Sequence, residues 1–394
     1  MHISASSQPV AIGVLGMHRS GTSALARLLN LLGADLGRTL LDASDDNPRG
    51  FWENRQIVDC HGELLQAVGS YLDDFVPLAD GWELTAPVAP FRIRLLDVLR
   101  SEFEGVPLWA FKDPRTCRLL PLWHQMLNQL AVSPCFILMV RPPAEVHESL
   151  AQRGGYPVNK SMLMTLTHML EAERHTRGRR RAIVTFDQLM SDWAGAIERI
   201  GRELAINWPN SIESIRPQVA EFLDPALRHH RSDQDSAPAG QPDFVRWANQ
   251  AYELIAAGAG DAAGLDAIAG EFRGAESRYL PWRPVWSMEE KLGREIRWSK
   301  LQQAKLHDVQ ARMDAQEEKV IDASARATMA EARMAQAEAR AVTAETRAAH
   351  AEQRASDAES RAAAADLKAA VAEVEAERAA TISGVVRRWM GNSR

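Results

Sequence analysis

A glycine-bounded loop near the start of the chain has residues that could bind a phosphate group. Gly16 and Gly21 are separated by four residues, and they lie between an apolar run, residues 10–15, and an amphipathic run, residues 24–32. A strand, a loop and a helix in this order turn backbone N–H groups and the positive end of the helix toward an anion. The spacing of the two glycines is that of a P-loop. We therefore predict a phosphate-binding loop at this position.

The residues in and after this loop differ from those of a nucleotide hydrolase. Such an enzyme has a lysine and then Ser or Thr after the second glycine, whereas Gly21 is followed here by Thr22 and Ser23. The cation of the loop is instead Arg19, two residues before that glycine. The missing lysine argues against ATP hydrolysis and indicates a nucleotide with a shorter phosphate arm.

A second candidate anion site follows the most apolar run of the chain, residues 135–140. Arg141 ends this run, two prolines suit the entry to a helix, and Ser149 lies about two turns along that helix. A guanidinium can bind a phosphate through two parallel hydrogen bonds, and a hydroxyl group can add another. Taken alone, the segment also fits an ordinary strand–helix junction with a surface Arg and a surface Ser.

Two further segments carry charged side chains that could act on a reacting group. Glu53 and Arg55 follow two aromatic residues, and Lys112 and Asp113 follow a short apolar run. A carboxyl group beside aromatic side chains can have its pKa raised toward the range that suits a general base. A Glu-x-Arg pair at a helix start can also be a cap or a surface ion pair. Asp113 can orient Lys112 or cap the next helix.

Together these motifs resemble the signature of sulfotransferases that use 3′-phosphoadenosine 5′-phosphosulfate (PAPS). In that family a basic-Ser-Gly-Thr loop binds the 5′-phosphosulfate, and an Arg with a Ser eight residues later binds the 3′-phosphate. The residues that match are Arg19, Ser20, Gly21, Thr22 and Ser23 in the loop, and Arg141 and Ser149 after the apolar run. The resemblance covers about residues 8–210 and is to bacterial sulfotransferase-family proteins of glycan and surface-polysaccharide biosynthesis.

The resemblance also implies roles for other residues. The Glu-x-Arg and Lys-Asp-Pro segments are similar to those of protein-tyrosine sulfotransferases, so Glu53 would be the general base and Lys112 a catalytic cation beside Arg19. Arg55 would support substrate binding, and His18 would contact the sulfate or substrate or orient the loop. The implied reaction moves a sulfuryl group from PAPS to a hydroxyl acceptor, a carbohydrate or surface glycan precursor, without a metal ion.

The apolar runs and the helical patterns between them indicate an α/β fold. Residues 108–111, 135–140 and 182–186 join residues 10–15 as expected strands. Continuous apolar strands that alternate with helices predict a parallel sheet covered on both faces, here a P-loop-like sheet of the sulfotransferase kind. In such a sheet both anion sites would lie at the carboxyl ends of the strands.

We expect the chain to be divided into four segments. An α/β domain covers residues 8–210, and a mostly helical extension, residues 211–287, completes it. A coiled coil follows over residues 288–382, and a short tail covers residues 383–394. Within the α/β domain, residues 35–105 form a helical insertion beside the sheet.

The extension contains two local features of its own. Arg228–Arg231 is a dense basic stretch that could close over the nucleotide or meet an anionic acceptor, or be a solvated turn. Asp233–Pro242 is expected to be an exposed loop. The late glycine-rich basic loop that the sulfotransferase family places over its nucleotide has no clear match here.

The C-terminal region repeats a seven-residue unit between Ala325 and Ala380. Alanine dominates heptad positions a and d, Arg recurs at g and Glu at e, which implies a left-handed supercoil. In a parallel pair each g side chain meets an e side chain of opposite charge, whereas an antiparallel homodimer would bring like charges together. The charges favour a parallel homodimer, or parallel pairing with a similar helix. Because alanine buries little surface and favours helix on its own, a single helix is the alternative.

Composition limits the other classes of function. The 394-residue chain has a net charge of −6, which does not suggest nucleic-acid binding. Its three cysteines lack metal-ligand spacing and indicate a reducing compartment. It has neither a leader with a basic region and apolar core nor an apolar run of about 18 residues, so we expect a cytoplasmic protein without a membrane span.

Two other functions compete with sulfotransfer. The chain could be a P-loop kinase or NTPase, although the loop lacks the lysine that such an enzyme uses. It could also be a non-catalytic scaffold in which the coiled coil is the working part and the α/β domain is a degenerate nucleotide binder. The presence of Arg19, Glu53, Lys112, Arg141 and Ser149 argues against degeneration.

Overall fold

The computed structural model describes residues 8–44, 47, 49–223, 241–258 and 261–390. The chain folds as two units, a first compact unit, Met1–Lys300, and a second unit, Leu301–Arg394. The basic stretch Arg228–Arg231 and most of the expected loop Asp233–Pro242 lie outside the described residues.

In the part of the chain that the structure describes, a four-stranded parallel sheet forms the centre of the first unit. Its strands are β1 (Val10–Leu15), β2 (Leu108–Lys112), β3 (Ser133–Val140) and β4 (Arg181–Thr185), in the order β2-β1-β3-β4. The predicted parallel α/β sheet is therefore confirmed. The last strand ends one residue earlier than expected because Thr185 caps the short helix α7 (Phe186–Ser191).

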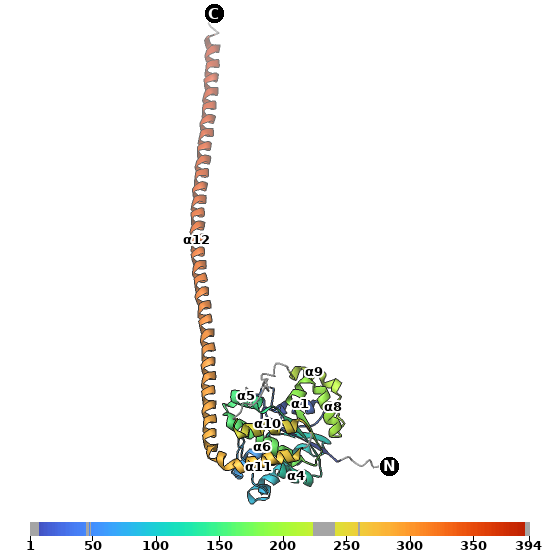
Figure 1. The fold of residues 1–394 in the computed structure, drawn as a ribbon. Helices are drawn as coiled ribbons and strands as arrows, with labels where there is room; N and C mark the ends of the chain where they lie inside the picture. The colour runs from blue at the N-terminus through green and yellow to red at the C-terminus, as the bar shows by residue number, and fades with distance from the viewer. Residues whose placement is uncertain (1–7, 45–46, 48, 224–240, 259–260, 391–394) are drawn as a thin grey trace, which may run out of the picture. The chain divides into compact units, whose positions relative to one another are not determined.

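Helices cover both faces of the sheet (Figure 1). One layer contains α2 (Arg55–Ala67), α3 (Ala89–Phe103) and α4 (Thr116–Gln129), with two short 3₁₀ turns, Trp82–Leu84 and Ala86–Val88, before α3. The other layer contains α1 (Thr22–Leu31), α8 (Trp193–Glu203) and α9 (Ile212–Phe222). Since successive strand residues point to opposite faces, β1 supplies Ala11 and Leu15 to the first core and Ile12 and Val14 to the second.

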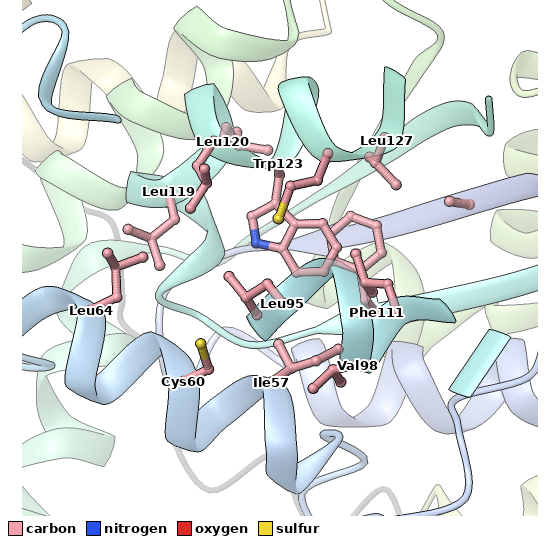
Figure 2. Packing of buried hydrophobic residues seen from close by; sticks show 14 of the residues in the cluster. Ile57, Cys60, Leu64, Leu95, Val98, Phe111, Leu119, Leu120, Trp123 and Leu127 are labelled. Atoms are coloured by element: carbon pink, nitrogen blue, oxygen red, sulfur yellow. The ribbon is translucent and has the colours of Figure 1, made fainter. Parts of the chain in front are cut away.

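Aromatic stacking fixes the first core. Trp123 of α4 stacks on Phe111 of β2 with ring centroids 3.9 Å apart, and Figure 2 shows both rings among the apolar side chains of α2, α3 and α4. Phe103 stacks on Trp109 in the same core at 4.3 Å. These rings anchor β2, the strand that ends in Lys112.

A third core lies beside the sheet. It joins α5 (Pro143–Gly154) and α6 (Val158–Thr176) to α10 (Asp243–Ala256) and α11 (Ala262–Tyr279). Helices α6 and α10 pack along each other, as Figure 1 shows. The segment expected to be a helical extension therefore shares a core with α5 and α6, which follow β3.

A helix of 108 residues, α12 (Arg283–Met390), follows a 3₁₀ turn, Leu280–Trp282, and ends the described chain. Its first turns belong to the compact unit, where Trp286 is buried with its ring 5.5 Å from Phe75. From residue 301 to 383 its side chains are exposed. The predicted long C-terminal helix is confirmed, and its pairing with another helix stays a prediction. No helix among the described residues is both long enough and apolar enough to cross a membrane.

Two glycines allow the loop after β1 to lie against its neighbours. Gly16 has φ of 157°, and a Cβ atom there would lie 2.4 Å from the backbone oxygen of Met139 in β3. Gly21 has φ of 96°, and a Cβ atom there would lie 2.5 Å from the ring of Phe186. Side chains are excluded at both positions by steric overlap and by the left-handed backbone. The loop is thus pressed onto the ends of β3 and β4.

We expect Gly16→Ala to destabilise the protein. The added methyl group overlaps the backbone of β3, and the strained φ adds to the penalty, so the free energy of unfolding should fall by about 2 kcal/mol or more. Urea denaturation followed by circular dichroism measures this change. The matched control is Gly62→Ala inside α2, where a Cβ atom has no neighbour within 4 Å. That change should raise stability by about 0.5–1 kcal/mol. Equal stability of the two variants would contradict the close approach.

Candidate active site

The carboxyl ends of all four strands open into one cleft with a volume of about 730 Å³. The loop after β1 brings Arg19, β2 ends in Lys112, and Arg141 and Phe186 directly follow β3 and β4. This is the edge of a parallel α/β sheet at which ligands usually bind.

Most of the residues that the sequence singled out line this cleft. They are His18, Arg19, Gly21, Thr22, Ser23, Glu53, Lys112, Arg141 and Ser149. Ser20, in the same loop, is buried, and its backbone N–H donates to the backbone oxygen of Met17 at 3.1 Å. Arg55 is not part of the cleft wall, because it begins α2 and pairs with the exposed Asp42 at 2.6 Å. The substrate-binding role of Arg55 stays a prediction.

The two candidate anion sites form one hydrogen-bonded group. Arg19 Nε donates to Ser149 Oγ at 2.8 Å, and Arg141 Nη1 donates to the backbone oxygen of Arg19 at 3.2 Å. Arg141 also pairs with Glu145 at 2.8 Å, and its guanidinium lies 4.2 Å from the ring centroid of Phe186. Arg19 adopts a left-handed backbone, with φ of 68°, which is rare outside glycine and is common at functional sites.

Two buried polar atoms at the cleft have no hydrogen-bond partner in the described part of the chain, and one of them, on Arg141, is a donor that fits an anionic ligand. Arg141 Nη2 is buried and has no hydrogen-bond partner among the described residues. The same holds for Nε2 of His18, whose pKa is lowered well below its ordinary value by burial and then by neighbouring His168. A buried donor without an acceptor costs free energy, which phosphate oxygens would recover at Arg141.

A buried ion pair faces the loop from the other side. Lys112 Nζ pairs with Glu53 Oε1, and it also donates to Ser23 Oγ at 3.0 Å and to the backbone oxygen of Phe51 at 3.2 Å. The three N–H groups of the ammonium therefore all have acceptors. Burial raises the pKa of Glu53, and the charge of Lys112 opposes this rise. A carboxyl group in a cleft whose pKa is shifted by burial and by a specific charged partner is a candidate functional residue.

The turn that carries Glu53 is held in place on both sides. Trp52 has a left-handed φ of 58°, and the guanidinium of Arg27 in α1 lies 4.3 Å from its ring centroid. Asn54 then caps α2, because its side-chain oxygen accepts from the backbone N–H of Gln56 at 3.1 Å and of Ile57 at 3.2 Å. The carboxylate is thus fixed by a strained turn and a helix cap.

A second buried network lies directly behind Lys112. His61 Nδ1 is 2.7 Å from Asp113 Oδ2, and Trp123 Nε1 donates to His61 Nε2 at 3.0 Å. Because the indole can only donate, His61 must accept at Nε2 and carry its proton on Nδ1, as a neutral ring. Arg115 Nη1 lies 3.0 Å from both oxygens of Asp113. Burial alone would raise the pKa of Asp113, but Arg115 and the hydrogen bond from His61 lower it below its ordinary range.

Asp113 forms the turn that leads into α4, whose N-cap residue is Arg115. Its side chain accepts from the backbone N–H of Arg115 at 3.0 Å, and its backbone oxygen accepts from Thr116 at 2.9 Å where α4 begins. It also follows Lys112 directly, so it fixes the chain at the residue that faces the cleft.

Sequence reasoning missed several charged and polar residues of the cleft wall. They are Arg49, Asp73, Arg115, Gln152, Arg153, Tyr156 and Arg294. Arg153 lies one turn after Ser149 in α5, so helical spacing could have placed it on the same side as the predicted hydroxyl. Arg294 comes from the first turns of α12, and no local pattern connects it to the loop. Among the described residues, no three His, Cys, Asp or Glu side chains are grouped so that they could hold a metal ion.

The chain has only low similarity to known proteins, in sequence and in structure. No protein-family profile and no curated protein matches the chain. One similar solved structure is the sulfotransferase domain of the olefin synthase of Synechococcus PCC 7002, with 18% identity and a TM-score of 0.38 over 63% of this chain and 94% of that one. Another is the sulfotransferase STF9 from Mycobacterium avium, with 16% identity and a TM-score of 0.32 over 68% and 76% of the two chains. At these scores the likeness carries no argument about activity.

We expect Asp113→Asn to destabilise the protein at neutral pH. The change leaves the guanidinium of Arg115, whose side chain is 13% exposed, without its counter-ion, which should cost about 3 kcal/mol in the free energy of unfolding. Because the folded-state pKa of Asp113 lies below its unfolded value of about 3.9, the stabilisation is present above that pH and lost as pH falls through the folded value.

Urea denaturation of both proteins between pH 7 and pH 3 measures this effect. The difference between wild type and variant should be constant near neutral pH and narrow below about pH 4. Asp42→Asn is the control, because Asp42 forms an ion pair with a side-chain exposure of 89% and should contribute less than about 1 kcal/mol. A pH-independent difference would show that the carboxylate charge is not the stabilising feature.

Proposed function

We propose that the protein transfers a sulfuryl group from PAPS to a hydroxyl group of an acceptor. The observation that carries this proposal is the hydrogen bond between Arg19 Nε and Ser149 Oγ, which unites the glycine loop with the Arg141–Ser149 pair. A nucleotide with anionic groups on both its 5′ and 3′ positions requires two such sites near one another. An ATP hydrolase requires the first site only.

In this proposal the two groups of residues hold the two ends of the donor. The loop, the N–H groups at the start of α1 and Arg19 would bind the 5′-phosphosulfate. Arg141 and Ser149 would bind the 3′-phosphate, with Arg141 Nη2 gaining an acceptor. The ring of Phe186 and the carboxylate of Glu145 keep the Arg141 guanidinium oriented before the donor arrives.

Glu53 and Lys112 would perform the chemistry. Glu53 would take the proton of the acceptor hydroxyl group while the oxygen of that hydroxyl group forms its bond to sulfur. Lys112 and Arg19 would stabilise the negative charge that develops on the 5′-phosphate oxygen as its bond to sulfur breaks. The products are a sulfate ester and 3′-phosphoadenosine 5′-phosphate (PAP). Lys112 already contacts both the base and Ser23 of the loop, so a single cation spans the two halves of the reaction.

We propose a carbohydrate or a surface glycan precursor as the acceptor. The class comes from the resemblance of the motifs, and the cleft wall offers Asp73, Gln152 and Tyr156 as polar partners for sugar hydroxyl groups. A second copy of the chain, paired through α12, is the macromolecular partner that we propose.

Binding of PAP tests the assignment of the donor site. Isothermal titration calorimetry should show PAP binding to the wild type with a dissociation constant in the micromolar range. Arg141→Ala should weaken this binding by about tenfold or more, because a charge-assisted contact to the 3′-phosphate is lost. Arg94→Ala is the control, since Arg94 lies on α3, pairs with Glu63 at 2.6 Å and is not part of the cleft wall. Binding of ATP or GTP in place of PAP would reject the sulfotransferase assignment.

Turnover of PAPS tests the general base. With water as the acceptor, release of PAP should fall about 10²-fold in Glu53→Gln while PAP affinity is retained. Since the pKa of Glu53 is raised, the wild-type rate should decline toward acid at a higher pH than an ordinary glutamate would cause, and the variant should lack this decline. Glu63→Gln on α2 is the control, because that carboxylate is half exposed and is not part of the cleft wall. An unchanged pH profile in Glu53→Gln would exclude the proposed base.

A further inference from the structure

The charges that recur at positions g and e of α12 do not pair with each other along the helix. In the alanine heptads the basic residues at g are Arg326, Arg333, Arg340, Arg347, Arg354, Arg361 and Lys368. The acidic residues at e are Glu331, Glu338, Glu345, Glu352, Glu359, Asp366 and Glu373. Positions g and e are two or five residues apart, whereas side chains on a helix meet at spacings of three and four. Arg326 pairs instead with Asp322, and from residue 327 to 385, where the structure describes every side chain, the helix forms no ion pair.

The heptad register continues before the alanine repeat, with larger side chains on the seam. Counting back in sevens from Ala327 places Val320, Met313 and Leu306 at position a, while position d holds Ala323, Gln316 and Val309. The three side chains at position a and that of Val309 are 50–69% exposed on the single helix. A solvent-exposed apolar stripe in this register is typical of the seam along which two helices of a coiled coil pack.

The basic residues at position g also continue in this register, whereas position e holds Ser324, Glu317 and Gln310. Lys319, Arg312 and Lys305 occupy position g, in step with the arginines further along. Before Lys305 the pattern stops, because Ser299, Gln302 and Trp298 occupy the next a, d and g positions, so that neither an apolar a residue nor a basic g residue remains. The apolar residues at position a and the basic residues at position g thus both begin near residue 305, just after the compact unit ends at Lys300.

We propose that α12 pairs with α12 of a second copy in a parallel, two-stranded coiled coil that is initiated by residues 305–323. The large apolar side chains of this initiating segment supply the buried surface that alanine cannot. The alanine heptads continue the pairing in register. This inference does not depend on the proposed enzymatic activity.

The charges specify the direction of the pairing. In a parallel pair each g residue faces the e residue of the next heptad on the other strand, so Arg326 faces Glu331, and Lys368 faces Glu373. Every such pair from residue 326 to residue 373 joins opposite charges. An antiparallel pair would place g against g and e against e, and every contact would be repulsive.

Sedimentation equilibrium of the full chain tests the association and its initiating segment. We expect twice the mass of one chain at micromolar concentration, and about a tenfold or greater rise in the dissociation constant for the double variant Leu306→Gln/Met313→Gln. The matched control is Val342→Gln/Leu367→Gln, because these residues are equally exposed, at 62% and 68%, but occupy positions b and f. The control should behave as the wild type does. A monomer up to about 100 µM, or equal effects of the two double variants, would overturn the proposal.

A charge exchange tests the pairing without relying on a loss of function. In one variant Glu331, Glu338, Glu345 and Glu352 become Lys, and in the other Arg326, Arg333, Arg340 and Arg347 become Glu. Each variant alone should associate more weakly than the wild type, and their mixture should form the mixed dimer in preference to either homodimer. Because the mixture can only associate if both helices are folded, misfolding cannot imitate this result. A mixture that associates no better than its components would overturn the proposed contacts.

Cross-linking tests the direction. The three native cysteines are buried in the compact unit, so an added cysteine can be oxidised selectively. Ala362→Cys, at position a, should form a covalent dimer on mild oxidation, because identical a positions face each other only in a parallel pair in register. Ser360→Cys, at position f, should cross-link far more slowly. Equal rates for the two variants would overturn the parallel arrangement.

Discussion

The contact between the loop after β1 and the end of β3 is the constraint on which the cleft depends. A Cβ atom at Gly16 would lie 2.4 Å from the backbone oxygen of Met139, so the loop rests directly on the neighbouring strand. That proximity brings the backbone oxygen of Arg19 to Arg141 and the side chain of Arg19 to Ser149. Two segments 122 residues apart in sequence therefore share one group of hydrogen bonds. Any side chain at position 16 would lift the loop and separate them.

Beyond the loop, the site is organised by buried charges of opposite sign in adjacent positions. Lys112 and Asp113 follow each other where β2 ends, and both are at most 5% exposed. Lys112 pairs with Glu53 in the cleft, whereas Asp113 pairs with His61 and Arg115. Burying a charge is unfavourable unless it is paired, so each residue depends on its own partner. The network around Asp113 anchors the backbone next to Lys112, and the ammonium group of Lys112 is held by Ser23, Phe51 and Glu53.

The strands, the loop and the Arg141–Ser149 spacing could be predicted because each is a local pattern in the sequence. The network around His61 could not, since His61 and Trp123 meet only when α2 and α4 pack on the same face of the sheet. Arg55 shows a second reason why the location of a residue could not be predicted from the sequence. Glu53 and Arg55 are two residues apart, but the helix cap at Asn54 lies between them and turns the chain. Only Glu53 lines the cleft as a result, so sequence proximity was a poor guide to shared location.

The start of α12 has a consequence for how the chain can be divided. A Cβ atom at Gly293 would lie 3.0 Å from Gly155, and Arg294 lines the cleft. Arg283 in the same turns pairs with Asp74, a carboxylate that is 1% exposed. The composition changes near Met288, after which the sequence contains no proline. The first turns of α12 nevertheless belong to the compact unit, because Arg283 pairs with the buried Asp74 and Arg294 forms part of the cleft wall. A gene fusion that exchanged the tail for another would have to join it after Arg294, because a junction at the compositional border would remove part of the cleft.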